Sequence, residues 1–265
     1  MKTIWTGRSG KVELRVVDTG TIYVGLADGK KLVEAQNADE VRRRLNEELG
    51  KLSPRYVAFP GAINRFLHFF PNGFHSKGYE EGERDYKLRA RSKLHQQVPL
   101  ADAVNGSGFG EAVLAAYNAT NLLSPFEKMR VRDVLQGPAA DQFVRAAARF
   151  ALGEIVSALP DLERALKPKD AAKWTVITYL PFLWGSDANM FLKPTVTVDF
   201  AERVGHRFAS DYSSRLHPDV YASLLDLAAN TEKELASLQP RDRIDIQSFI
   251  WVVGDYKDDA EQPQP

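Results

Sequence analysis

Alternating apolar residues separated by turn signals mark the first part of the chain, and this limits the possible folds more than any other feature. The alternating apolar residues are Val12, Leu14 and Val16, followed by Ile22, Val24 and Leu26. A period of two residues is typical of strands with one buried face. Turn signals at Asp18-Thr19-Gly20 and Asp28-Gly29 separate the runs. The pattern predicts a small antiparallel meander over residues 2–33.

Most of the remaining chain has its apolar residues at helical spacing. Residues 38–50 and 62–70 predict two helices, and Tyr56–Phe59 predicts a further strand. A glycine-rich joint, Val104–Gly110, precedes a long run of helices, one of which starts at the capping box that opens with Ser124. We therefore predict an α+β fold, with a small N-terminal antiparallel sheet layer before a larger helical domain. The expected parts are residues 1–105 with a basic helix, the helical domain 106–256 and a disordered tail, 257–265.

The composition excludes several classes of function. The chain has no cysteine, which rules out disulfides, thiolate zinc and a cysteine nucleophile. Its five histidines show no metal-binding spacing, and no nucleotide-binding loop is present, so we expect neither a metal nor a cofactor. Lys+Arg and Asp+Glu balance at 35 each, so net charge steers the protein toward no partner. No run resembles a signal peptide or a membrane span, which favours a cytoplasmic protein.

A basic helix is predicted at about residues 80–97. Its cations lie at helical spacing and are Arg84, Lys87, Arg89, Arg91 and Lys93. A cationic face of this density is able to follow the phosphates of DNA. The alternative is a solvated face whose cations pair with the neighbouring acids Glu80, Glu81 and Glu83.

The segment Pro168–Pro194 predicts an apolar helix that delivers Lys173 and Asp187 to one loop edge. Its Pro-to-Lys spacing and the later Ser186-Asp187-Ala188-Asn189-Met190 context resemble the helix-hairpin-helix DNA glycosylases. Lys169 and Ala171 stand where the hairpin of that family has glycines. The resemblance implies cleavage of an N-glycosidic bond, with Asp187 stabilising the sugar cation and Lys173 as an amine nucleophile.

The resemblance predicts a DNA glycosylase-like enzyme that removes a flipped base, in repair or in defence against foreign DNA. Asp199 is a rival catalytic carboxylate. The expected base pocket consists of Trp174, Tyr179, Phe182, Trp184 and Asn189. Each of these residues also has a simpler interpretation: a turn residue at 187, a surface lysine at 173, a helix-dipole partner at 199 and core aromatic residues. The alternative function is a non-catalytic module that binds nucleic acid or an acidic protein.

Overall fold

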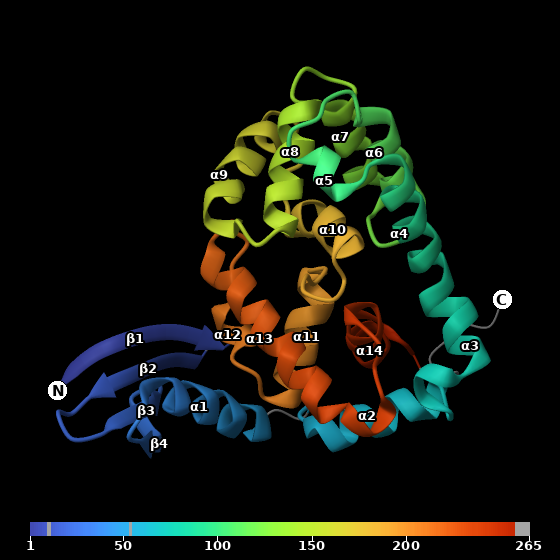
Figure 1. Ribbon diagram of the computed structural model, residues 1–265. Helices are drawn as coiled ribbons and strands as arrows, with labels where there is room; N and C mark the ends of the chain where they lie inside the picture. Colours follow the sequence, from blue (N-terminus) through green and yellow to red (C-terminus); the bar gives the residue numbers. More distant parts are fainter. Residues whose placement is uncertain (10–11, 53–54, 258–265) are drawn as a thin grey trace.

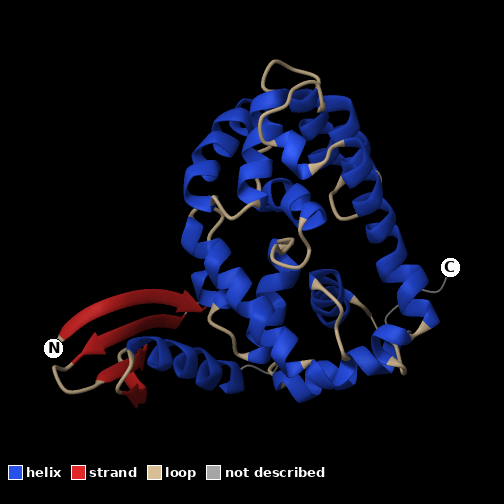
Figure 2. Cartoon of the chain, viewed as in Figure 1, coloured by secondary structure: helices blue, strands red, loops and turns tan. Residues whose placement is uncertain are grey.

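The computed structural model describes residues 1–9, 12–52 and 55–257, and its strands form one sheet at the N-terminus (Figure 2). The strands pair antiparallel in the order β1-β2-β3-β4, as the alternating pattern predicts. Their bounds are Lys2–Ser9 for β1, Val12–Asp18 for β2, Tyr23–Ala27 for β3 and Lys30–Ala35 for β4. The predicted α+β class is confirmed.

Helix α1, Ala38–Leu52, packs against the sheet and gives this part of the chain a core of its own. The core is small and consists of Leu14, Ala27 and Leu45, with Trp5 and Val33 at its edge. Only glycine fits at position 25, because a Cβ there would lie 2.6 Å from the side chain of Val33 and 2.9 Å from that of Val41. The close approach of α1 to β3 therefore depends on this glycine.

Helices from α2 onward share one large hydrophobic core that begins at Ala62. Helix α2, Ala58–Phe69, runs along the lower edge of the molecule in Figure 1, and α4, Asp85–Gln97, rises along the right side. The core thus divides the chain after α1, whereas the sequence places the main boundary at the glycine-rich joint near residue 105.

The other long helices follow α4 and pack around this core. Their bounds are α6 Gly110–Asn118, α7 Pro125–Leu135, α8 Ala140–Ala151, α9 Ile155–Leu166, α10 Trp174–Trp184, α11 Pro194–Val204, α13 Pro218–Glu234 and α14 Arg243–Asp255. The apolar helix α10 is buried along its whole length, and α14 lies near the centre of the view in Figure 1.

Local sequence signals predict some ends of helices and strands correctly and others wrongly. The capping box at Ser124 is present, with the side chains of Ser124 and Glu127 each accepting a backbone N–H. The strand predicted at Tyr56–Phe59 is wrong, because α2 already begins at Ala58. Proline is common at the first position of a helix, but Pro160 lies inside α9. The tail predicted from residue 257 lies, apart from Lys257, outside the described residues.

Among the described residues, no helix combines the length and the apolar character needed to cross a membrane.

Candidate binding pocket between α4 and α14

A π-helical turn lies immediately before α4, and charged side chains of both segments point into the protein. The turn spans Glu80–Arg84 and follows the short helix α3, Lys77–Tyr79. A π-helix carries one extra residue per turn, is rare, and occurs often at functional sites. Here it places Glu83, Arg84 and, one turn later, Lys87 in the protein interior. Three charged side chains that the sequence predicts to lie on the surface are therefore buried.

Arg84 does not face solvent, because it bridges two aspartates of the α14 segment. Its guanidinium donates two parallel hydrogen bonds to Asp242, at 2.8 and 2.9 Å, and one to Asp245, at 2.7 Å. Tyr79 and Arg241 also donate to Asp245. Burial alone would raise the pKa of Asp245, but the bonds from Arg241 and Tyr79 and the charge of Arg84 hold it below its usual value. The guanidinium of Arg84 is therefore bonded within the protein and is not available to bind a phosphate.

Lys87 is the most perturbed cation of the basic helix. Its side chain has no exposed surface, and its Nζ donates to Glu83 Oε2 at 3.1 Å and to Ser248 Oγ at 2.8 Å. Burial lowers the pKa of Lys87 to about 8, although the charge and hydrogen bond of Glu83 act to raise it. A lysine with a lowered pKa beside a pocket is a candidate functional residue.

A small pocket of about 40 Å³ lies beside Lys87. Four separate segments contribute its lining, which consists of Tyr86, Lys87, Asn121, Leu122, Phe191, Lys193, Gln247 and Trp251. Three aromatic side chains form walls, and amide and ammonium groups supply the polar part, as in sites that orient small planar groups. Sites that enclose a whole ligand have volumes of roughly 300 Å³ or more. This pocket therefore admits only the edge of a molecule.

The cations of α4 divide into two faces. Arg84, Lys87 and Arg91 face the protein, and Arg91 donates to Ser186 Oγ at 2.8 Å. Arg89 and Lys93 are exposed and form no ion pair with a described residue. They lie three and seven residues after Tyr86, so they share its face of the helix. We call Tyr86, Arg89 and Lys93 the outer stripe. The predicted phosphate-binding face thus keeps two of its five cations.

The structure does not bring Lys173 and Asp187 to one edge. They lie before and after α10, whose 11 residues span about 16 Å along the helix axis. Lys173 pairs with Asp170 at 3.1 Å, and its side chain is 49% exposed. Asp187 is 79% exposed, and Arg91 approaches it at 3.9 Å. Each residue thus pairs with a different partner, at opposite ends of α10.

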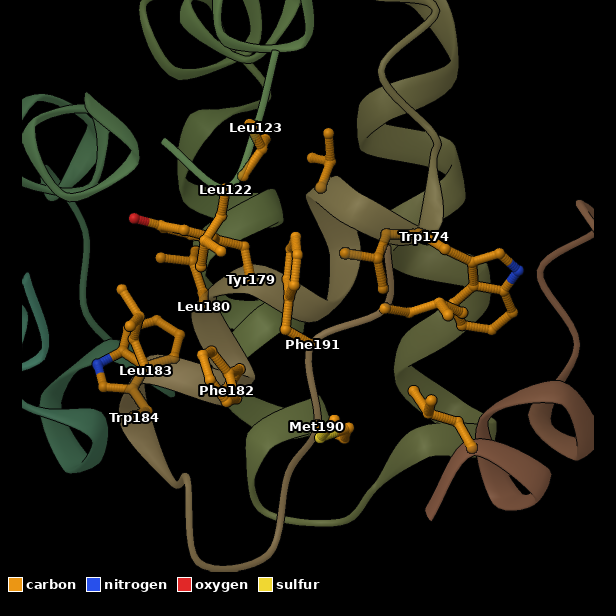
Figure 3. Packing of buried hydrophobic residues seen from close by; sticks show 14 of the residues in the cluster. Leu122, Leu123, Trp174, Tyr179, Leu180, Phe182, Leu183, Trp184, Met190 and Phe191 are labelled. Carbon is orange, nitrogen blue, oxygen red and sulfur yellow. The ribbon is translucent and has the colours of Figure 1, made fainter. Parts of the chain in front are cut away.

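The aromatic side chains predicted to receive a base are part of the main core. Figure 3 shows Trp174, Tyr179, Phe182 and Trp184 packed among buried residues around Phe191. Their polar atoms are already satisfied, since Trp184 Nε1 donates to the carbonyl of Val98 and Tyr179 donates to that of Ala116. None of the four lines the pocket beside Lys87.

The remaining predicted site residues also have structural partners. Asp199 accepts hydrogen bonds from Arg55 at 2.7 Å and Arg203 at 2.6 Å. Asn189 is buried, where it donates to the carbonyl of Ala151 and accepts from the hydroxyl of Tyr221. The bonds of Asn189 tie the loop before α11 to α8 and α13.

A larger cleft of about 910 Å³ lies between β1, α1 and the start of α13. Two of its three arginines are already paired with carboxylates. Arg42 pairs with Asp211 at 2.6 Å, and Arg207 pairs with Asp226 at 3.0 Å. The pocket beside Lys87 is the better candidate site, because it combines three aromatic walls with amide and ammonium groups.

Sequence reasoning missed Gln247, Lys193 and Trp251 as site residues. Gln247 and Trp251 lie one turn apart on α14, which makes a shared face detectable. No sequence signal joins that face to Lys193 or to α4. The i,i+4 spacing of Glu83 and Lys87 does predict their ion pair, but it gives no sign that the pair is buried.

The described residues contain no cluster of histidine, aspartate and glutamate side chains able to hold a metal ion. Comparisons with protein-family models, with curated proteins and with solved structures find no match for this chain.

Proposed function

We propose that the protein binds single-stranded or locally opened nucleic acid, and that the edge of one unpaired base enters the pocket between α4 and α14. The observation that carries this proposal is the continuity of the outer stripe with the pocket. Tyr86 forms part of the pocket wall, and the exposed cations Arg89 and Lys93 continue from it along the same face of α4.

Proteins that hold single strands combine a cationic track with aromatic side chains on which bases stack. The outer stripe supplies the cations, and Tyr86 and Trp251 are partly exposed at the pocket. Stacking on an aromatic side chain contributes roughly 1–3 kcal/mol per base. Two phosphate contacts and one stacked base support weak binding that weakens further as salt increases.

The test measures the binding of a fluorescent 15-residue oligo(dT) strand by anisotropy over a range of NaCl concentrations. The double variant R89A/K93A removes both exposed cations of the outer stripe. Each phosphate contact on a single strand contributes about 0.7 to the slope of log K against log salt. We therefore expect the variant to lower that slope by about 1.4, and to bind more weakly at low salt.

The matched control is R132A/K169A. Both residues are exposed, and neither forms an ion pair with a described residue. They lie on α7 and on the turn before α10, away from the outer stripe. The control should bind as the wild type does. Equal slopes for the two double variants would contradict the proposal, as would the absence of any binding by the wild type.

A further inference from the structure

Strand β1 leaves one edge of the sheet open. Among the described residues, its backbone pairs only with that of β2. The N–H of Asp28 donates to the carbonyl of Glu13, so the backbone of Glu13 faces β3. Backbone direction alternates along an antiparallel strand, and Arg15 therefore faces β3 as well. Their partners on β1, Arg8 and Thr6, consequently point their N–H and C=O groups away from β2, toward the open edge.

This open edge borders the cleft of about 910 Å³ between β1 and the start of α13. Trp5 and Thr6 line the cleft on the side of β1, and Val220 lines it on the side of α13. Leu216 adds apolar surface, and Arg215 is exposed and forms no ion pair with a described residue. A groove beside an edge strand accepts an extended peptide by strand addition, in which backbone hydrogen bonds supply affinity and side-chain pockets supply specificity.

The charge at this edge favours an acidic partner. Strand β1 carries Lys2 and Arg8 and no acidic residue. Arg8 lies opposite Glu13, but the carboxylate of Glu13 already pairs with Arg15 at 3.0 Å. Together with Arg215 in the cleft, the edge presents an excess of cations to the molecule that covers it. Antiparallel pairing with a second copy of β1 would bring Lys2 opposite Arg8, and like charges placed opposite each other are destabilising.

We infer that the open edge of β1 is a docking site for an acidic, extended segment of a partner protein, which adds to the sheet as a further strand. Partner residues opposite Thr6 and Arg8 bond to them through the backbone, and their side chains lie on the face that carries Arg8. These are the acidic positions. The alternate residues lie on the face of Trp5 and are apolar, because the cleft there includes Leu216 and Val220. The site shares no residue with the pocket between α4 and α14, so the inference does not depend on nucleic-acid binding.

The experiment measures the fluorescence anisotropy of labelled peptides on the wild-type protein. The probe alternates glutamate and valine over the 8-residue length of β1. Two derivatives carry backbone N-methyl groups, on the glutamates in one and on the valines in the other. Methylated glutamates lose the N–H groups that face β1, whereas methylated valines lose those that face solvent. We expect the first derivative to bind at least about tenfold more weakly than the probe, and the second to bind within about twofold of it.

Two proline variants test the same edge from the side of the protein. T6P removes one open-edge N–H without breaking a bond to β2, and edge strands tolerate proline at such positions. It should weaken binding of the probe about fivefold. The matched control is E34P on β4, the other edge strand. Glu34 lies opposite Val24, whose backbone faces β2, so its N–H also points to an open edge, but β4 lines no part of the cleft. E34P should bind as the wild type does.

Equal binding of the two methylated derivatives overturns the inference, as does tighter binding of a peptide that alternates lysine and valine. Absence of probe binding at about 1 mM peptide also overturns it. A dimer seen by light scattering that T6P dissociates and the probe does not would show that a second copy covers the edge, which likewise overturns it. The comparison of the two derivatives uses the wild-type protein, so it does not depend on whether T6P folds. None of these outcomes bears on the binding of oligo(dT), which tests the proposed function separately.

Discussion

The buried ammonium of Lys87 should make the stability of the protein rise with pH above 8. The pKa of Lys87 falls from its ordinary value of 10.5 to about 8 in the folded protein. Below pH 8 the group is charged in both states, so its burial penalty is present in full. Between these two pKa values the unfolded chain binds more protons than the folded one, and stability therefore increases with pH. As the pH rises through this window, the penalty is relieved.

The size of the effect follows from the shift in pKa. One pKa unit corresponds to about 1.4 kcal/mol, so a rise from pH 8 to pH 9.5 should add about 2 kcal/mol to the free energy of unfolding. The upper limit of pH 9.5 is needed because the buried tyrosines act in the opposite direction. Burial raises the pKa of Tyr117 well above 10, so folded protein loses stability once unfolded tyrosines ionise.

Urea denaturation of the wild type and of K87M at four values between pH 7.5 and pH 9.5 measures this effect. Methionine fills the space of the lysine stem and does not titrate. The difference in unfolding free energy between the two proteins should move in favour of the wild type by about 2 kcal/mol as the pH rises. A difference that does not change with pH would show that Lys87 reaches water in the folded state, and would refute the account of its burial.

Two further predictions concern contacts outside the pocket. R84M leaves Asp242 and Asp245 without their shared buried cation, and urea denaturation should show a loss of about 3–5 kcal/mol; a loss below about 1 kcal/mol would mean that the aspartates find water instead. S124A removes one half of the capping box at the start of α7 and should cost about 1 kcal/mol in the same measurement, with S92A on the exposed side of α4 as a control that changes stability by less than about 0.5 kcal/mol.

Features that depend on neighbouring residues were predictable from the sequence. The meander follows from alternation and turn residues, and the start of α7 follows from Ser124 and Glu127. The division of the α4 cations was not predictable, since the partners of Arg84 lie about 160 residues away at the start of α14. The helical spacing of the five cations is compatible with either face pointing inward. Only the position of Asp242 and Asp245 decides which face does so.

The pocket was still harder to predict, because it combines side chains from four segments. Lys193 follows α10, Gln247 lies on α14, and Tyr86 lies on α4, so no local pattern relates them. The sequence favoured α10 because its aromatic residues and flanking charges are adjacent in the chain. Aromatic residues concentrated in one helix more often form a core, and Figure 3 shows that outcome for Trp174 and Tyr179.

The buried ion cluster also has a role in placing the pocket walls. Replacing buried ion pairs with apolar residues of similar volume is often neutral or stabilising, so stability alone does not account for Arg84 and its two aspartates. The pairs have directional geometry, and they join α4 to the start of α14 at a fixed register. Tyr86 and Gln247 lie within two residues of Arg84 and Asp245 respectively. An apolar contact would leave the two helices free to slide past each other, whereas the bidentate bonds fix the distance between Tyr86 and Gln247 across the pocket.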